Sequence, residues 1–319
     1  SYVDLIAFDI SDIKNVKEIK RIEALFNNYM SMGMRVGSSN GIMVDWQPKN
    51  NVTVYKTECD QQQGWGGIYY EDGIALSREV ASSFISTRSA VTPPGNNLNA
   101  GIGGSMARFT IAGNHLYALD GANMDIVEVT TPQNPKAKKE IPISWDAETI
   151  FPYKENLFFG TQSGMLIYDI KNPESPSLIS TYAHIRSCDP VVVVDDYAYV
   201  TLRSGGTCAG FTNQLEVIDI SNLTSPVLRT TCPMTNPYGL GIDNGTLFVC
   251  DGSSGLRVID ATDVTAICSK QLAHYDNIHA LDIIPYQNIA MMIGDDGLYQ
   301  YDYSDPSAIK LLSILALQR

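Results

Sequence analysis

The sequence contains no uninterrupted run of about 18 apolar residues, the length a helix needs to cross a bilayer. It has few basic residues, 22 against 35 acidic ones, for a net charge of −13. This excludes nucleic acid as a partner, because phosphate contacts need clustered Lys and Arg, and it disfavours an anionic membrane surface. Serine-hydrolase (GxSxG), zinc-protease (HExxH), phosphate-loop and dinucleotide signatures are missing. The spacing of the six cysteines matches no zinc motif.

What the sequence does have is an internal repeat. Its clearest copies are Leu215–Leu228 (LEVIDISNLTSPVL) and Leu166–Ile179 (LIYDIKNPESPSLI). Each reads as an apolar strand, an acidic residue, a polar turn with Pro and a second strand. The acidic residue is Asp9 in the first copy and Glu128 in the next, 119 residues later. From Glu128 it recurs at intervals of 41, 50, 41 and 42 residues, at Asp169, Asp219, Asp260 and Asp302. Such carboxylates accept backbone hydrogen bonds within turns, so we predict a structural role for all six.

Two further short strands, joined by turn-forming residues, precede each later copy, so one repeat holds four antiparallel strands. A period near 40 to 45 residues with four short strands is typical of propeller blades. We therefore predict an all-β, single-domain, six-bladed β-propeller over residues 1–319. Residues 1–26 are an incomplete first blade and 27–107 a long loop insertion with a lead-in. The other five blades are residues 108–143, 148–184, 189–233, 237–273 and 279–315.

The strings LIYDIKNPESPSLIS, LEVIDISNLTSPVL and GLRVIDA resemble the LVIVD repeat, and GGSMARF at Gly103–Phe109 resembles the lead-in of bacterial members of that family. The resemblance covers Arg108–Leu315 well and Ser1–Phe26 in part. It implies a bacterial, exported β-propeller and brings no catalytic motif. The expected location is the periplasm, or the outer membrane or cell surface as a lipoprotein.

The start of the chain and the insertion before Arg108 raise separate expectations. The chain begins inside the third strand of a blade, so we expect upstream residues that include two strands, a signal peptide and a lipidated cysteine. Within the insertion, Gly41–Trp46 and Val52–Thr57 resemble a hairpin. That hairpin either extends the outer edge of the first blade or belongs to a degenerate blade of its own. Trp65 and its neighbouring tyrosines suit either a binding loop or a cover over the propeller.

A disulfide between Cys188 and Cys208 is expected, because both positions lie at the same end of one blade and the bridge would hold a long loop. Cys250 and Cys268 fall on strand positions and are expected to be small buried apolar residues.

Propellers place binding groups on the loops around one end of the central channel. The predicted ligand-binding residues on these loops are Arg108, Trp145, Asp146, Glu148, His184, Arg186, Asp189, Arg203, His274, Tyr275, Asp276 and His279. No catalytic residue is assigned and no cofactor is expected. Carboxylates and imidazoles in such loops could bind a divalent cation such as calcium, although no spacing demands a metal.

Two functions remain open. The first is a non-enzymatic binding or scaffold propeller of the bacterial cell envelope, which holds a protein or a glycan. The second is a metal-assisted hydrolase of the lactonase or esterase type, in which Glu148, Asp189, Asp276 and His279 converge near the axis. The sequence does not establish an enzyme, and the missing catalytic motifs favour the first function.

Overall fold

Five four-stranded antiparallel sheets make up most of the computed structural model, which describes residues 3–26, 30–31, 34–35, 103–184, 190–204 and 212–317. By its internal contacts the chain divides into two units, residues 1–42 with 97–319, and residues 43–96. Every described residue belongs to the first unit, so the predicted Gly41–Trp46 hairpin and the aromatic loop around Trp65 lie outside the described residues.

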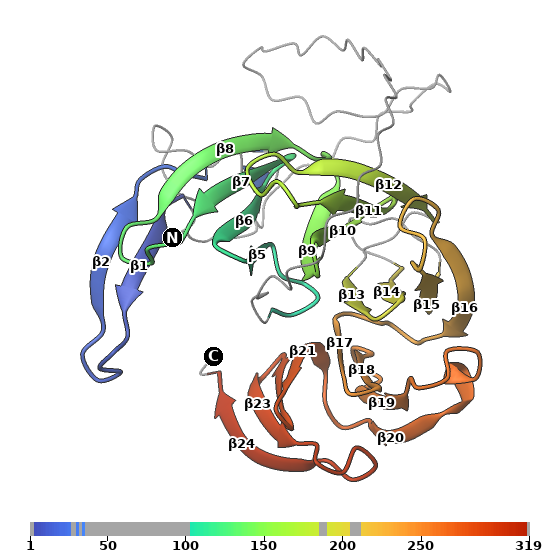
Figure 1. Ribbon diagram of the computed structural model, residues 1–319. Helices are drawn as coiled ribbons and strands as arrows, with labels where there is room; N and C mark the ends of the chain where they lie inside the picture. Colours follow the sequence, from blue (N-terminus) through green and yellow to red (C-terminus); the bar gives the residue numbers. More distant parts are fainter. Residues whose placement is uncertain are drawn as a thin grey trace, which may run out of the picture. The chain divides into compact units, whose positions relative to one another are not determined.

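Each four-stranded sheet is one blade, with its strands in chain order across the sheet (Figure 1). Blade I is β5 (Phe109–Ala112), β6 (His115–Asp120), β7 (Asn123–Glu128) and β8 (Lys136–Pro142). Blade II is β9 (Ala147–Tyr153), β10 (Asn156–Thr161), β11 (Gly164–Asp169) and β12 (Ser177–Ala183). Blade III is β13 (Val191–Val194), β14 (Tyr197–Leu202), β15 (Gln214–Asp219) and β16 (Val227–Pro233). Blade IV is β17 (Leu240–Asp243), β18 (Thr246–Cys250), β19 (Leu256–Asp260) and β20 (Gln271–Tyr275). Blade V is β21 (Ala280–Tyr286), β22 (Ile289–Gly294), β23 (Gly297–Asp302) and β24 (Lys310–Ala316).

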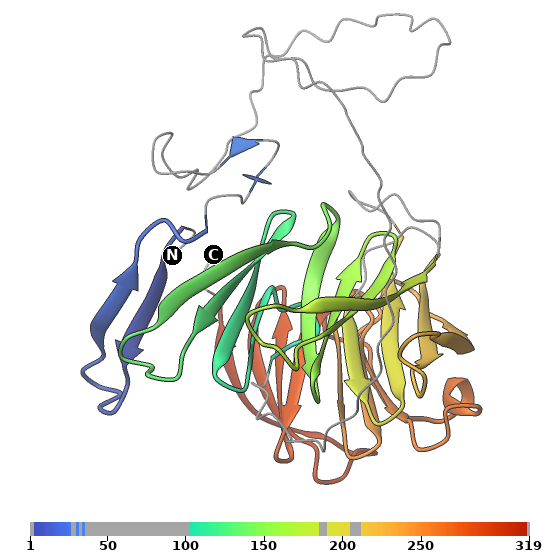
Figure 2. The same ribbon diagram turned by 45° about the horizontal axis from the view of Figure 1, so that its top comes forward.

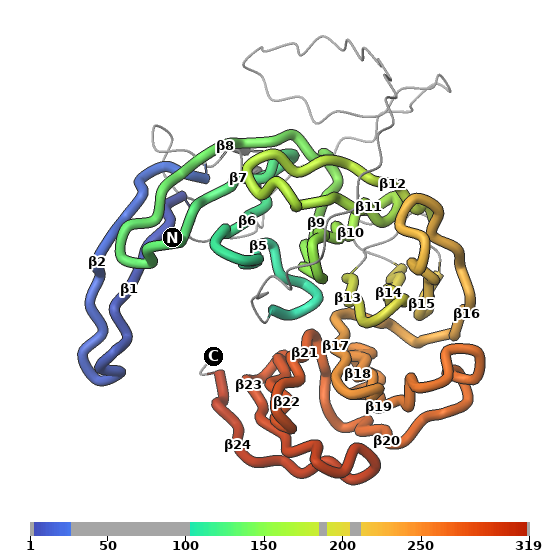
Figure 3. Tube along the Cα trace, viewed as in Figure 1, coloured from blue at the N-terminus to red at the C-terminus, as the bar shows by residue number. Residues whose placement is uncertain are grey.

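The blades follow one another around a common centre, with the first strand of each blade innermost and the fourth outermost (Figure 3). Neighbouring inner strands contact each other, from β5 through β9, β13 and β17 to β21. The predicted β-propeller arrangement of four-stranded antiparallel blades is confirmed.

The acidic residue of the repeat organises the turn after each third strand. In blade III, Oδ1 of Asp219 accepts hydrogen bonds from the amide of Ser221 (2.9 Å) and from its hydroxyl (2.6 Å). Asp260 and Asp302 form the same pair of bonds, while Asp9 and Asp169 accept the amide bond. The predicted structural role of these aspartates is therefore confirmed.

The hydrophobic core lies between blades. Tyr117, Met124 and Ile126 of blade I pack with Leu157 and Phe159 of blade II, and all five side chains are fully buried or nearly so. Equivalent clusters join blade II to III, III to IV and IV to V. Because each inter-blade layer holds buried aliphatic and aromatic side chains from both partners, the blades stabilise one another by apolar burial.

The predicted number of blades is wrong for the described part of the chain, which has five complete blades rather than six. The first copy of the repeat folds as a two-stranded sheet of β1 (Leu5–Asp9) and β2 (Lys17–Ile22). A second two-stranded sheet joins β3 (Met30–Ser31) to β4 (Met34–Arg35). In Figures 1 and 2 the β1–β2 sheet lies beside blade I. No helix within the described ranges is long and apolar enough to span a membrane.

The cysteine pairing differs from the expectation. Cys232, at the end of β16, forms a disulfide with Cys268, which lies in the short 3₁₀ helix η2 (Ile267–Ser269) before β20, and their Cα atoms are 5.3 Å apart. The expectation that Cys268 is a small buried apolar residue is therefore wrong. Cys250 is free and fully buried, as expected. The predicted partners Cys188 and Cys208 lie outside the described residues.

Candidate functional site

The predicted site residues on blade II are held by hydrogen bonds to their own blade. Asp146 is buried, and its carboxylate accepts hydrogen bonds from the hydroxyls of Ser144 and Ser163, the latter at 2.8 Å. Oε1 of Glu148 accepts a hydrogen bond from the side-chain amide of Gln162 (2.8 Å). These two carboxylates therefore organise the loop ends of the blade.

Blades III to V bring four side chains together at the loop end. The guanidinium of Arg203 lies 4.1 Å from the centre of the Tyr238 ring, a cation–π geometry. The ring of His279 packs edge-on against the same tyrosine, with 6.1 Å between ring centres. Nδ1 of His279 in turn contacts a carboxylate oxygen of Asp295. The predicted residues Arg203 and His279 thus share one cluster, the Arg203–Tyr238–His279–Asp295 chain.

Four further predicted residues have other surroundings. Trp145 is 72% exposed, and Asp276 is also exposed. Nε2 of His274 lies 2.6 Å from the Ser254 carbonyl, and the Tyr275 hydroxyl donates to the Ile309 carbonyl at 3.5 Å.

The other four members of the prediction differ in what the structure describes of them. The ring of His184 lies 6.2 Å from that of Tyr182, between ring centres. Arg186 and Asp189 lie outside the described residues. Arg108 lines a groove on blade I instead of the loop cluster.

The carboxylate and imidazole groups of the hydrolase hypothesis have separate partners. Glu148 is bound to Gln162 and His279 to Asp295, while Asp276 is exposed. Within the described ranges, no group of three or more His, Cys, Asp or Glu side chains has the geometry of a metal site.

A half-buried carboxylate links the segment before blade I to blades IV and V. Asp282, on β21, accepts a hydrogen bond from the hydroxyl of Ser105 (3.1 Å), and that hydroxyl accepts one from the amide of Leu240 (2.8 Å). Burial raises the pKa of Asp282 to about 6, although hydrogen bonds from Ser105 and from backbone amides act in the opposite direction. Residues Gly103–Ala107 are thereby fixed to blades IV and V.

Gly239 explains how this carboxylate fits. A Cβ atom at Gly239 would lie 2.0 Å from Oδ1 of Asp282, far inside van der Waals contact. The close approach of chain and carboxylate therefore requires glycine at this position. The Ser105–Asp282 contact is a structural link between distant segments of the chain, and sequence reasoning did not identify it.

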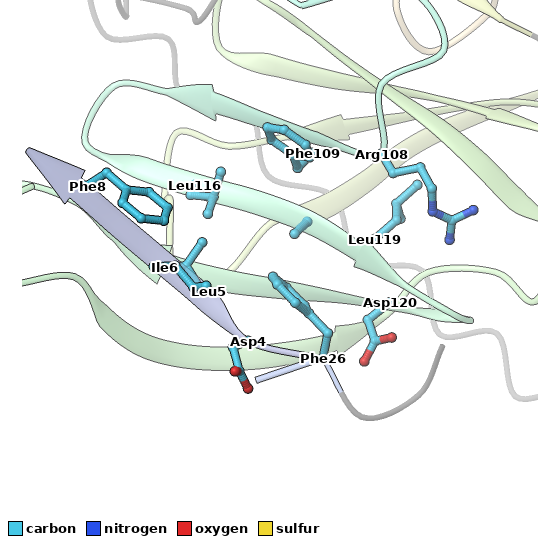
Figure 4. A pocket seen from close by; sticks show the side chains of 11 residues that line it. Asp4, Leu5, Ile6, Phe8, Phe26, Arg108, Phe109, Leu116, Leu119 and Asp120 are labelled. Atoms are coloured by element: carbon cyan, nitrogen blue, oxygen red, sulfur yellow. The ribbon is translucent and has the colours of Figure 1, made fainter. Parts of the chain in front are cut away.

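A hollow lies between β1 and blade I (Figure 4). This groove has a volume of about 620 Å³. Its apolar lining comes from both sides: Leu5, Ile6, Phe8 and Phe26 from the N-terminal segment, and Phe109, Leu116, Ala118 and Leu119 from blade I. Asp4, Arg108 and Asp120 lie at one end, as Figure 4 shows. We call this feature the β1 groove.

A buried carboxylate, that of Asp125, lies on the strand next to the wall of the β1 groove. Asp125 lies on β7 directly across from Ala118 and therefore on the sheet face that lines the groove. Its side chain is only 6% exposed, and Oδ2 has no hydrogen-bond partner among the described residues. Burial, together with the charges of Asp120 and Glu140, raises the pKa of Asp125 to about 7. A cation placed here would stabilise the ionised form of Asp125.

Sequence reasoning missed the β1 groove because its walls are far apart in the chain. The available signal was the apolar residue Phe8 in a copy of the repeat that has only two strands, since such a strand has an apolar face and too few neighbours to cover it.

Comparison with known families identifies the repeat. Residues 157–184 and 185–233 match the family model of the LVIVD repeat. The chain carries LVIVD repeats. The first match covers β10 to β12 of blade II, and the second covers all four strands of blade III. No curated protein sequence matches the chain.

Among solved structures, a functionally unknown protein from Desulfotomaculum acetoxidans is similar, at 10% identity and a TM-score of 0.52 over 71% of this chain and 72% of that chain. A protein from Lactobacillus plantarum is 12% identical, with a TM-score of 0.48 over 64% of this chain and 68% of that one. Apo AztD from Citrobacter koseri is 11% identical, with a TM-score of 0.45 over 62% and 58%. The first of these supports the fold alone.

Proposed function

We propose that this LVIVD-repeat protein is a non-enzymatic binding and scaffold propeller of the bacterial cell envelope, which holds a protein partner. The observation that carries the proposal is the β1 groove, an apolar hollow of about 620 Å³ with acidic residues at one end. Phe8 and Phe109, on its two sides, are 51% and 65% exposed. Exposed apolar surface of this kind is costly in water and is typical of an interaction site.

The predicted site residues at the loop ends of the blades favour binding over catalysis. A general base must reach a substrate proton, whereas the carboxylates of Asp146 and Glu148 already accept hydrogen bonds from their own blade. His279 is engaged by Asp295 and by the Tyr238 ring. No observation specifically favours the hydrolase, so binding is the simpler account of this surface.

An exported location is part of the proposal. The Cys232–Cys268 disulfide supports it, because disulfides persist in oxidising compartments such as the periplasm and the cell surface. The excess of acidic residues is compatible with a protein partner that carries basic groups.

We further propose that the β1–β2 sheet is the outer half of a sixth blade. Like β23 and β24 of blade V, β1 and β2 are antiparallel and are joined by a turn that an aspartate organises. This proposal places the β1 groove at the position where the inner half of that blade would lie.

A neutral dye tests whether the β1 groove is an open apolar binding site. We expect N-phenyl-naphthylamine to bind with one saturable site per protein and with increased fluorescence, because the groove offers a dry apolar surface. Phe109→Asp should weaken dye binding at least tenfold, because a charge replaces an apolar wall.

Leu178→Asp is the matched control. Leu178 is 53% exposed and lies on β12, the outer strand of blade II, away from the β1 groove. Equal dye binding by the two variants, or no saturable binding by the unmodified protein, would contradict the proposal.

A further inference from the structure

The β1–β2 sheet has the detailed geometry of the third and fourth strands of a complete blade. In all six copies of the repeat, the pairing between the third and the fourth strand shifts its register by one residue. The shift falls at the same place in each copy, immediately before the residue that precedes the recurring acidic residue of the repeat (Asp9 in β1). In β1 the shift falls between Ala7 and Phe8, and in β15 between Val217 and Ile218. The other four copies shift at the equivalent place. A bulge fixes the twist of a strand pair, so β1 and β2 are shaped as part of a blade.

In every complete blade the strand equivalent to β1 has a partner on its inner edge. The second strand pairs there along its whole length, as β14 does with β15. The residue after the acid also donates its amide to a carbonyl in the turn between strands one and two. Ile220 donates to Asp196 (2.8 Å) and Ile170 to Glu155 (2.9 Å). In the described residues β1 is paired only with β2.

Two apolar side chains, one on β1 and one just after it, are exposed where their equivalents are buried. Phe8 is 51% exposed, whereas its counterparts in blades I to V, Val127, Tyr168, Ile218, Ile259 and Tyr301, are at most 8% exposed. Ile10 is 67% exposed, whereas Ile170 and Ile220 are 0% and 4% exposed. The exposure is therefore specific to the strand that has no inner neighbour.

We propose that the inner edge of β1, which has no strand partner among the described residues, and the β1 groove take up an extended segment of a partner polypeptide, which pairs antiparallel to β1 as an added strand. This inference rests on the proposed binding function and names its ligand class. Backbone hydrogen bonds to β1 would supply affinity, and alternate apolar side chains would cover Phe8 and enter the groove beside Leu116.

The charged end of the groove specifies one further feature of the segment. In blade III the C-terminal end of β14 lies opposite the start of β15. By equivalence, the C-terminal end of the added strand lies beside Asp4 and Asp120, where Oδ2 of Asp125 is buried without a partner among the described residues. Asp4 is already paired with Arg21 (2.6 Å), so a Lys or Arg at that end would pair with Asp125. A second copy of this chain is disfavoured as the occupant, because each copy has a net charge of −13.

The probe for this proposal is a synthetic peptide with the sequence of residues 191–203 (VVVVDDYAYVTLR). It contains strands β13 and β14, which occupy the equivalent place in blade III, and it ends in a basic residue. Calorimetric titration should show one peptide bound per protein. Phe8→Asp in the protein should weaken binding at least tenfold, and so should the change Arg203→Glu made in the peptide. The control variant Leu178→Asp should bind the peptide like the unmodified protein.

Three outcomes would overturn the proposal. The first is that a scrambled peptide binds as tightly as the 191–203 peptide, and the second is that the 191–203 peptide does not bind. The third is a concentration-dependent dimer that Phe8→Asp abolishes, because such a dimer would assign the inner edge of β1 to a second copy of the chain. Saturable dye binding without peptide binding would refute this inference and leave the binding function standing. If the protein bound neither the dye nor the peptide, both this inference and the proposed binding function would be refuted.

Discussion

Replacing both Cys232 and Cys268 by serine is expected to lower the free energy of unfolding by about 4 kcal/mol. The disulfide closes a loop across a sequence separation of 36 residues and thereby restricts the unfolded chain. Its removal restores the conformational entropy of the unfolded chain, which for a loop of this length gives this magnitude. The effect is large because the bridge joins the outer strand of blade III to η2 of blade IV, so it crosses a boundary between blades. Urea unfolding followed by circular dichroism measures the difference.

Reduction of the unmodified protein is the matched control for the double variant. A mild reductant should lower its stability to that of the double serine variant and should leave the variant unchanged. Cys250, which is free and buried, does not contribute to this difference. If reductant left the unmodified protein unchanged, or the double variant were as stable as the oxidised protein, the cross-link would have no role in stability.

Asp125→Asn is expected to stabilise the protein by about 2 kcal/mol at pH 8, because surrounding water screens part of the charge effect, and to have almost no effect near pH 3. The folded protein raises the pKa of Asp125 from its usual 3.8 to about 7, because the carboxyl is buried beside Asp120 and Glu140. Between these values the folded state binds a proton that the unfolded state has lost, so stability falls as the pH rises from about 4 to 7. Asparagine lacks the charge, and the advantage of the variant should therefore grow across this window and then remain constant. Urea unfolding at half-unit steps of pH measures it.

Asp219→Asn is the control of opposite sign. Hydrogen bonds from Ser221 and Arg229 lower the pKa of Asp219 to about 2, so its carboxylate stabilises the folded state above about pH 4, and this contribution is lost as the pH falls towards 2. Asp219→Asn should therefore destabilise the protein at neutral pH. A parallel pH dependence for both variants would refute the assignment of a buried, charge-strained carboxyl to Asp125.

The blades could be predicted from sequence because local chemistry specifies them. An apolar strand, an aspartate and a polar turn recur with each blade, and the hydrogen bond from the Ser221 amide to Asp219 is a contact between residues two apart. The disulfide could not be predicted in this way. Cys232 and Cys268 lie in successive repeats, and only the packing of β16 against η2 brings them together.

The candidate site was predicted only in part, for the same physical reason. Arg203 and His279 were expected on the loop end, and their contacts with Tyr238 follow from how blades III, IV and V adjoin. The β1 groove depends on the placement of residues 4–26 against β5 and β6, which the sequence indicates only through the apolar residue Phe8. The sixth blade was expected from the repeat around Asp9, but a repeat motif specifies two strands and does not supply the other two.

Amide hydrogen exchange along β1 tests the central claim most directly. The account holds that β1 is a blade strand with an open inner edge, whereas the equivalent strand β15 is paired on both sides. It predicts that the alternate amides of β1 which face away from β2, together with that of Ile10, exchange orders of magnitude faster than their counterparts in β15. Adding the 191–203 peptide should slow the exchange of those amides and leave β15 unchanged. Equal protection of β1 and β15 in the protein alone would contradict the account.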